Sequence, residues 1–136
     1  MENNVTVLLI DNNEVDNFIH QRVLEKFSDR IRLIIFTNTS DVLMHITKNK
    51  IAPLYIFLSM NYPASDNFGF LKQLEILNVN KENITICILS TLLLPTDIEK
   101  LKIDNNYIGY VEKPLTREKL HSIFDEQYSA FGLHGK

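Results

Sequence analysis

The sequence predicts an α/β domain built on a parallel β-sheet. Five short runs rich in Ile, Val, Leu, Phe and Tyr alternate with segments of helical period along the whole chain. The runs show little polar alternation, which is typical of strands covered by helices on both faces. With 136 residues the chain has the length of one domain. These observations predict a single parallel sheet with right-handed crossovers.

The apolar runs are too short for independent helices and rich in residues that favour strands. The predicted strands cover residues 5–10, 31–36, 54–58, 84–89 and 107–111. The only cysteine, Cys87, lies in the fourth run, and we expect it to be a buried small hydrophobe. A single cysteine excludes an intramolecular disulfide.

Apolar side chains at helical spacing predict helices between the strands, with the apolar stripe toward the core. The first stripe consists of Val15, Phe18, Ile19, Val23 and Phe27. The second consists of Phe68, Leu71, Leu74 and Leu77, and the last of Leu120, Ile123, Phe124 and Tyr128. Weaker patterns predict two further helices at 40–46 and 96–103, the latter opened by a capping box of Thr96 and Glu99 behind Pro95.

Composition excludes several classes of function. The chain has 17 acidic and 14 basic side chains without a basic block, so we expect no nucleic-acid partner. No apolar run approaches the roughly 18 residues of a membrane span, and we expect a cytoplasmic protein that does not bind membranes. The four glycines form neither a dinucleotide-binding nor a P-loop motif.

The histidines do not indicate a metal site. His20, His45, His121 and His134 are scattered singly, without the spacing of metal ligands. We therefore expect them at the surface or on helix faces and propose no zinc site.

Polar residues follow four of the predicted strands. They are the segment 11–14 after the first strand, 59–63 after the third, Ser90 and Thr91 after the fourth, and 110–114 at the fifth. Because ligands bind outside the carboxyl ends of the strands in open parallel sheets, we expect these residues to form one functional rim.

From Val5 to about Phe124 the chain resembles the receiver domain of two-component response regulators. That family carries an acidic pair after the first strand, a phosphoacceptor Asp after the third with Pro four residues later, Ser or Thr after the fourth, and Lys-Pro after the fifth. Residues in register are Asp11, Pro63, Ser90, Lys113 and Pro114. Segments 13–18, 95–100 and 109–116 are also similar to short single-domain receivers.

The resemblance implies a flavodoxin-like, doubly wound (βα)5 three-layer sandwich whose parallel five-stranded sheet has the order 2-1-3-4-5. One receiver domain would fill residues 1–136, with a core at about 5–128 and a short tail at about 129–136. Because the chain ends shortly after the fifth helix, we expect a stand-alone bacterial receiver without an output domain.

The chain departs from the family at the residues that carry the chemistry. Ser59 stands at the phosphoacceptor position, Asn12 replaces the second acid of the pair, and Asn67 stands where the family has Gly. A serine hydroxyl is neutral and needs a general base to become a nucleophile. Asp11 is then the one carboxylate left for Mg²⁺, which prefers hard anionic ligands, so we expect weak metal binding or none. Pairing of Asp11 with Lys113 is the simpler arrangement, and a residual cation on Asp11 is the alternative.

The resemblance assigns roles to other residues of the rim. Ser90 would follow the phosphoryl group, Tyr110 would report the state through its rotamer, Lys113 would contact the phosphoryl group, and the bond before Pro114 would be cis. We expect Asp66 to cap a helix rather than to accept phosphate. The three leucines 92–94 either pack on the following helix or are exposed for a partner.

These residues predict a pseudo-receiver in two-component (phosphorelay) signalling that acts by phosphorylation-independent protein interaction. It would be no enzyme and need no cofactor. Its partner would be a sensor histidine kinase or another signalling protein, or a second copy bound through the fourth helix, fifth strand and fifth helix. One alternative is a phosphorelay receiver with a non-standard acceptor, such as Asp11. A remote alternative is a small flavin- or nucleotide-binding enzyme on the same fold, although the chain lacks a phosphate loop after the first strand.

Overall fold

The computed structural model describes residues 5–48, 54–59, 65–76, 84–91 and 108–124. The elements in chain order are β1 (Val5–Ile10), α1 (Glu14–Phe27), β2 (Ile31–Phe36), α2 (Thr39–Lys48), β3 (Leu54–Ser59), α3 (Ser65–Ile76), β4 (Ile84–Ser90), β5 (Ile108–Glu112) and α5 (Arg117–Phe124). The predicted helix at 96–103 lies outside the described residues, as do Pro63, Leu77, the leucines 92–94, Tyr128, His134 and the predicted tail.

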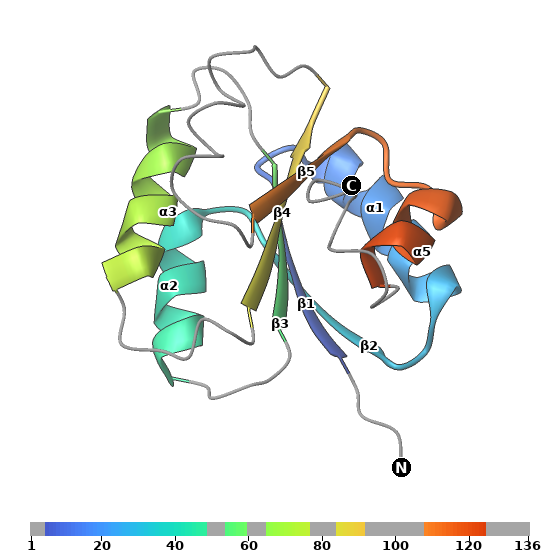
Figure 1. The fold of residues 1–136 in the computed structure, drawn as a ribbon, viewed down its shortest axis with the longest axis horizontal. Helices are drawn as coiled ribbons and strands as arrows, with labels where there is room; N and C mark the ends of the chain where they lie inside the picture. The colour runs from blue at the N-terminus through green and yellow to red at the C-terminus, as the bar shows by residue number, and fades with distance from the viewer. Residues whose placement is uncertain (1–4, 49–53, 60–64, 77–83, 92–107, 125–136) are drawn as a thin grey trace.

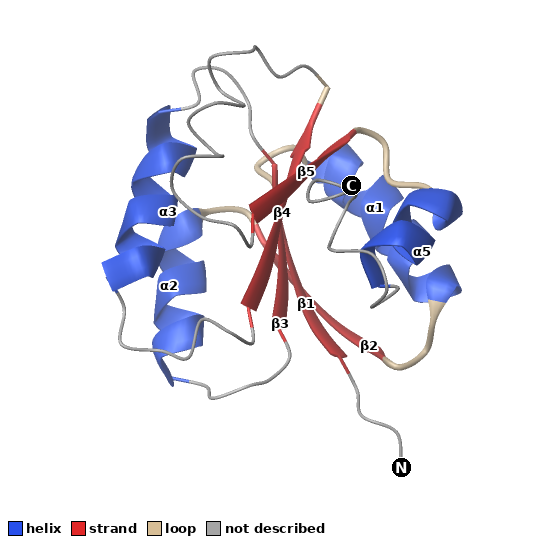
Figure 2. Ribbon diagram, in the orientation of Figure 1, coloured by secondary structure: helices blue, strands red, loops and turns tan. Residues whose placement is uncertain are grey.

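The strands form one sheet of order β2-β1-β3-β4-β5, and all its pairs are parallel. Helices α2 and α3 cover one face and α1 and α5 the other, which gives three layers (Figures 1 and 2). The predicted flavodoxin-like fold class and strand order are therefore confirmed. None of the helices in the described ranges is long and apolar enough to cross a membrane.

The strand ends determine where the polar rim lies. β1 and β2 have the predicted bounds, whereas β3 and β4 each run one residue further, to Ser59 and Ser90. Ile10 is in register with Leu58, and Leu58 with Ile88, so β1, β3 and β4 end at one edge of the sheet. The residues that follow these strands are therefore neighbours.

Two hydrophobic clusters fill the space between the layers. Alternate residues of each central strand point to opposite faces, as the pleat requires. On the face covered by α2 and α3 the buried strand residues include Leu8, Ile10, Ile56, Leu58, Ile86 and Ile88. On the face covered by α1 and α5 they are Val7, Leu9, Phe57, Cys87 and Leu89. Cys87 is buried as predicted, and its burial raises the pKa of the thiol well above its usual value.

Helix α1 faces the sheet with a different side from the one predicted. Val15, Phe18 and Ile19 were expected in the core, but they are 67%, 59% and 43% exposed. The buried residues are Asn17, His20 and Leu24, while Val23 and Phe27 are partly buried and pack against the core. The side-chain amide of Asn17 donates to the backbone oxygen of Asp11 at 2.7 Å, and Leu24 belongs to the core cluster. These two contacts fix the rotation of the helix and turn its first apolar residues outward.

The C-terminal end of α1 is joined to α5 by aromatic packing. The ring of Phe124 stacks on that of Phe27, with centroids 5.6 Å apart, and makes an edge contact with Tyr55 at 4.7 Å. Leu120 and Ile123 of α5 are buried, as the sequence predicted. Helix α5 is thus anchored beside α1 on the same face of the sheet.

Candidate functional site

Four polar residues from four strands meet at the carboxyl edge of the sheet. Asp11 directly follows β1, Ser59 and Ser90 end β3 and β4, and Lys113 directly follows β5. The backbone amide of Lys113 donates to the carbonyl oxygen of Ser90 at 2.8 Å, which keeps Lys113 beside β4. Asp11, Ser59 and Ser90 are all buried. The carboxyl edge of the sheet thus brings these four residues together, and Asp11, Ser59 and Ser90 are closed to solvent there.

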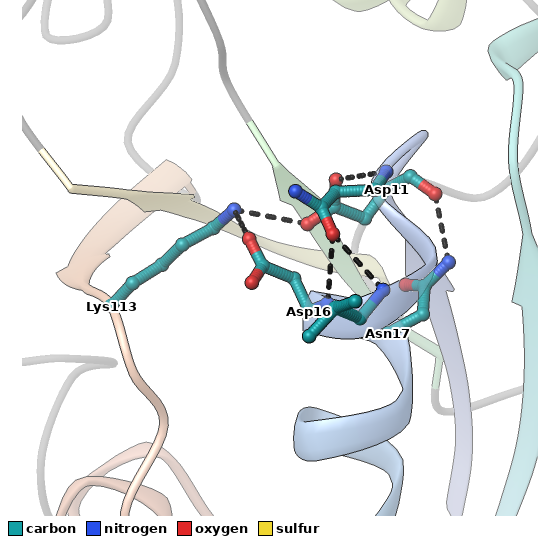
Figure 3. A network of polar contacts seen from close by, with 6 residues as sticks. Asp11, Asp16, Asn17 and Lys113 are labelled. Carbon is teal, nitrogen blue, oxygen red and sulfur yellow. Dashed lines mark hydrogen bonds and ion pairs between the residues drawn. The ribbon is translucent and has the colours of Figure 1, made fainter.

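Asp11 is engaged at every oxygen it offers (Figure 3). Its Oδ1 accepts the backbone amide of Asn13 at 2.9 Å, and its Oδ2 accepts the ammonium of Lys113 at 2.9 Å. Its backbone oxygen accepts the side-chain amide of Asn17. The predicted ion pair between Asp11 and Lys113 is confirmed.

The start of α1 adds a second carboxylate to this site. Asn13 is the N-cap of the helix, and its Oδ1 accepts the backbone amides of Val15 and Asp16 at 3.0 and 3.1 Å. This cap fixes the first turn so that Asp16 Oδ2 lies 2.8 Å from Lys113 Nζ. Lys113 thus bridges two carboxylates, one after β1 and one on α1 (Figure 3).

The bridge has a buried half and a partly exposed half. The Asp11 side chain is 0% exposed and that of Lys113 is 7% exposed, whereas that of Asp16 is 32% exposed. Burial by itself lowers the pKa of Lys113, but the hydrogen bonds and charges of Asp16 and Asp11 outweigh it and hold the pKa above its usual value. The ammonium therefore stays charged and leaves one negative charge uncompensated in the trio.

The turn that carries Lys113 is fixed from below by α5. The ammonium of Lys119 donates to the backbone oxygens of Glu112 at 2.7 Å and Pro114 at 3.0 Å, on either side of Lys113. The peptide bond between Lys113 and Pro114 is cis, as the resemblance implied. The backbone on both sides of Lys113 is therefore held in place.

His20 lies under this site, inside the fold. We expected it at the surface or on a helix face, and it occupies the inward face of α1, buried, with no hydrogen-bond partner for Nδ1 among the described residues. Burial lowers its pKa, and the charge of Lys113 lowers it further, against the smaller opposite effects of Asp16 and Asp11. His20 is therefore neutral at pH 7. Its buried neighbour on the same face of α1, Asn17, carries an uncharged amide.

The residues present do not fit the Mg²⁺ ion that receiver chemistry uses. Both carboxylate oxygens of Asp11 already accept hydrogen bonds, and a neutral hydroxyl and a neutral amide stand at positions 59 and 12. No group of three or more His, Cys, Asp or Glu that could hold a metal ion occurs in the described part of the chain. Mg²⁺ prefers hard anionic oxygen ligands, and those in this pocket are committed to an ammonium.

Other predicted residues lie apart from the bridge. Tyr110 is partly buried and packs against the core cluster under α2 and α3. Asn12 is exposed in the bend between β1 and α1, and Asp66 and Asn67 belong to the first turn of α3.

Sequence reasoning missed Asp16, Asn17 and His20 as parts of the site. Asn17 and His20 lie at helical spacing with Leu24, and this spacing could have identified the buried face of α1. With that face toward the sheet, Asp16 lies next to the end of β5 and contacts Lys113.

No model of a protein family matches this chain, and no curated protein matches it either. Solved structures do match. The chain is similar to a two-component response regulator from Cytophaga hutchinsonii, with a TM-score of 0.78 and 21% identity over 92% of this chain and 97% of that one. It is similar to a CheY-like receiver domain from Methylobacillus flagellatus, with a TM-score of 0.70 and 17% identity over 90% and 98%. A two-component response regulator from Legionella pneumophila gives a TM-score of 0.68 and 28% identity over 84% and 90%. The fold of this chain is thus the fold of response regulator receiver domains.

Proposed function

We propose that the chain is a pseudo-receiver of two-component signalling, which acts in the cytoplasm through protein contacts and without being phosphorylated. The observation that carries the proposal is the occupied pocket, where Lys113 is held between Asp11 and Asp16 and a serine stands at the acceptor position. The structural neighbours named as two-component response regulators support a signalling role.

Phosphoryl transfer needs a nucleophile, and the buried hydroxyl of Ser59 is a poor one. A carboxylate is anionic at pH 7, whereas a hydroxyl must lose its proton as it attacks. The charge that develops on the phosphoryl oxygens must also be stabilised by cations, and here the ammonium of Lys113 is shared by two carboxylates. The scaffold would keep the shape of a receiver without its reaction.

The exposed apolar residues at the start of α1 support the interaction role. Val15, Phe18 and Ile19 lie on one face, because residues three and four apart are neighbours on a helix. The guanidinium of Arg22 lies 5.6 Å from the ring centre of Phe18. We propose this patch as a contact for a sensor histidine kinase or another signalling protein. A homodimer formed through the fourth helix, β5 and α5 is the second interaction that we propose.

The test of the proposal is phosphorylation of the purified chain by acetyl phosphate with Mg²⁺, followed by intact-mass analysis. The wild type should not gain a phosphoryl group. A matched variant, Ser59→Asp combined with Asn12→Asp, supplies the missing carboxylates and serves as the positive control. Stable labelling of the wild type, mapped to this pocket, contradicts the proposal.

A second measurement addresses the interaction. Immobilised wild type and Phe18→Ser/Ile19→Ser are compared for binding to the sensor histidine kinases of the host. The wild type should bind one of them equally with and without acetyl phosphate, and the variant should not. Binding that requires acetyl phosphate would favour the phosphorelay alternative.

Asp16 is the residue that most favours that alternative. Its carboxylate is anionic, partly exposed and next to Lys113, so it has the chemistry of an acceptor that Ser59 lacks. Mapping any phosphoryl group by peptide mass analysis after acetyl phosphate treatment, with Asp16→Asn as the control, distinguishes it from Asp11.

A further inference from the structure

The carboxylates at this rim hold a cation that belongs to the chain itself. Lys113 Nζ lies 2.9 Å from Asp11 Oδ2 and 2.8 Å from Asp16 Oδ2, so one positive charge is shared by two negative ones. The Asp11 side chain is completely buried, and an ionised carboxylate in that position needs a counter-charge. Lys113 supplies it without any ion from solution.

We infer that Lys113 permanently takes the place of the divalent metal in this pocket, with Asp16 as the second anionic ligand of its ammonium. The inference deepens the proposed function and rests on it only for the identity of the pocket. It accounts for the burial of Asp11 in a pocket where Asn12 and Ser59 supply no further charge.

The backbone that carries Lys113 is held by contacts that do not depend on a ligand. The amide of Lys113 is bound to Ser90, and Lys119 binds the carbonyls of Glu112 and Pro114 on either side. Asp16 is fixed independently by the Asn13 cap. Both partners are thus anchored at their backbones by their own elements, and only the two side chains remain to be ordered when the bridge forms.

A divalent ion would have to displace this ammonium. Like charges a few ångströms apart repel one another, so Mg²⁺ and the Lys113 ammonium cannot both sit against Asp11 and Asp16 at full strength. With the ammonium removed, the same two carboxylates would be left facing each other and would attract a divalent ion. The Lys113 ammonium therefore weakens metal binding at these two carboxylates.

The experiment titrates Mn²⁺ alone, and in parallel Mg²⁺ alone, into the full chain and follows backbone amides by NMR. In the wild type, Mn²⁺ should not selectively broaden the amides of residues 11–17 and 113. In Lys113→Met, it should broaden them with an affinity at least about tenfold higher than in the wild type. Lys113→Met/Asp16→Asn should lose this gain. Glu14→Gln, which removes an exposed acid from the same helical turn, should behave as the wild type.

Each arm has an outcome that overturns the inference. Selective broadening around Asp11 in the wild type does so by itself, whether or not Lys113→Met folds. A folded Lys113→Met variant that gains no affinity also does so. Metal binding by the wild type without phosphorylation would sink this inference and leave the proposed function standing. Labelling by acetyl phosphate would sink the proposed function instead.

Discussion

The ammonium of Lys113 lies 2.8 Å from the carboxylate of Asp16, although 97 positions separate the two residues in the chain. This contact joins the turn after the last strand to the first turn of α1. The second contact of the same ammonium, with Asp11, lies deeper and is shielded from water. The two halves of the bridge should therefore differ in strength and in their response to salt.

Replacing each carboxylate in turn should reveal that difference. Asp16→Asn should lower the free energy of unfolding by about 1 kcal/mol, because the pair is partly exposed. Asp11→Asn should lower it by about 3 kcal/mol, because the replacement removes the buried partner of an ammonium that is itself largely buried. Urea unfolding at pH 7 measures both. Glu14→Gln is the control for loss of a negative charge near the helix start, and equal losses for Asp11→Asn and Asp16→Asn would contradict this description.

The two faces of α1 should respond oppositely to truncation. Leu24→Ala should cost about 3 kcal/mol, because it empties a site in the core. Phe18→Ser should change the free energy of unfolding by no more than about 0.5 kcal/mol, since the ring is exposed and contacts Arg22. Thermal or urea unfolding of the two variants measures both changes. A large loss of stability in Phe18→Ser would show that the face predicted from the apolar pattern packs on the sheet after all.

Stability should fall as the pH drops below neutrality, in part because of His20. Its pKa in the folded state is lowered from the ordinary value of 6.5, so the unfolded chain binds this proton first. The stability linked to His20 is therefore complete above pH 6.5 and is lost as the pH falls toward the folded pKa, at a slope of at most about 1.4 kcal/mol per pH unit. Urea unfolding of wild type and His20→Gln between pH 7 and 5 measures it. An unchanged slope in the variant would show that other groups cause it.

At high pH the bridge itself should open. The pKa of Lys113 is raised in the folded state, so its contribution is present below the unfolded pKa and disappears as the pH rises through the folded one. Lys113→Met should therefore lose less stability than the wild type above pH 10 or so, where an ordinary lysine titrates. Unfolding monitored from pH 8 to 11 compares the two, and parallel curves would count against a shifted Lys113.

Much of the fold could be predicted because buried strands are short runs of apolar, strand-favouring residues. The runs at 5–10 and 31–36 have the bounds of β1 and β2, and the alternation of strands and helices predicted a parallel sheet. The strand order came from the resemblance to receiver domains, and the structure confirms it. The rim was predictable for the same reason, since parallel strands end at the same edge. Neither inference required knowledge of how a helix is rotated.

The apolar pattern of residues 15–27 did not predict how α1 is rotated against the sheet. Counting apolar side chains selects Val15, Phe18 and Ile19, whereas the helix is oriented by a hydrogen bond from Asn17 and by the packing of Leu24. A hydropathy pattern assigns polar residues to the exposed face, so it cannot identify a polar residue on the inward one. Asp16 was missed as a consequence, because it reaches Lys113 only with the helix turned this way.

Lys119, a residue of α5, donates hydrogen bonds to the two backbone carbonyls beside Lys113. Helix α5 therefore supports the turn after β5 as well as covering the sheet. Loss of the Lys119 contacts would remove two of the interactions that hold the backbone around Lys113, while the bond of its own amide to Ser90 would remain.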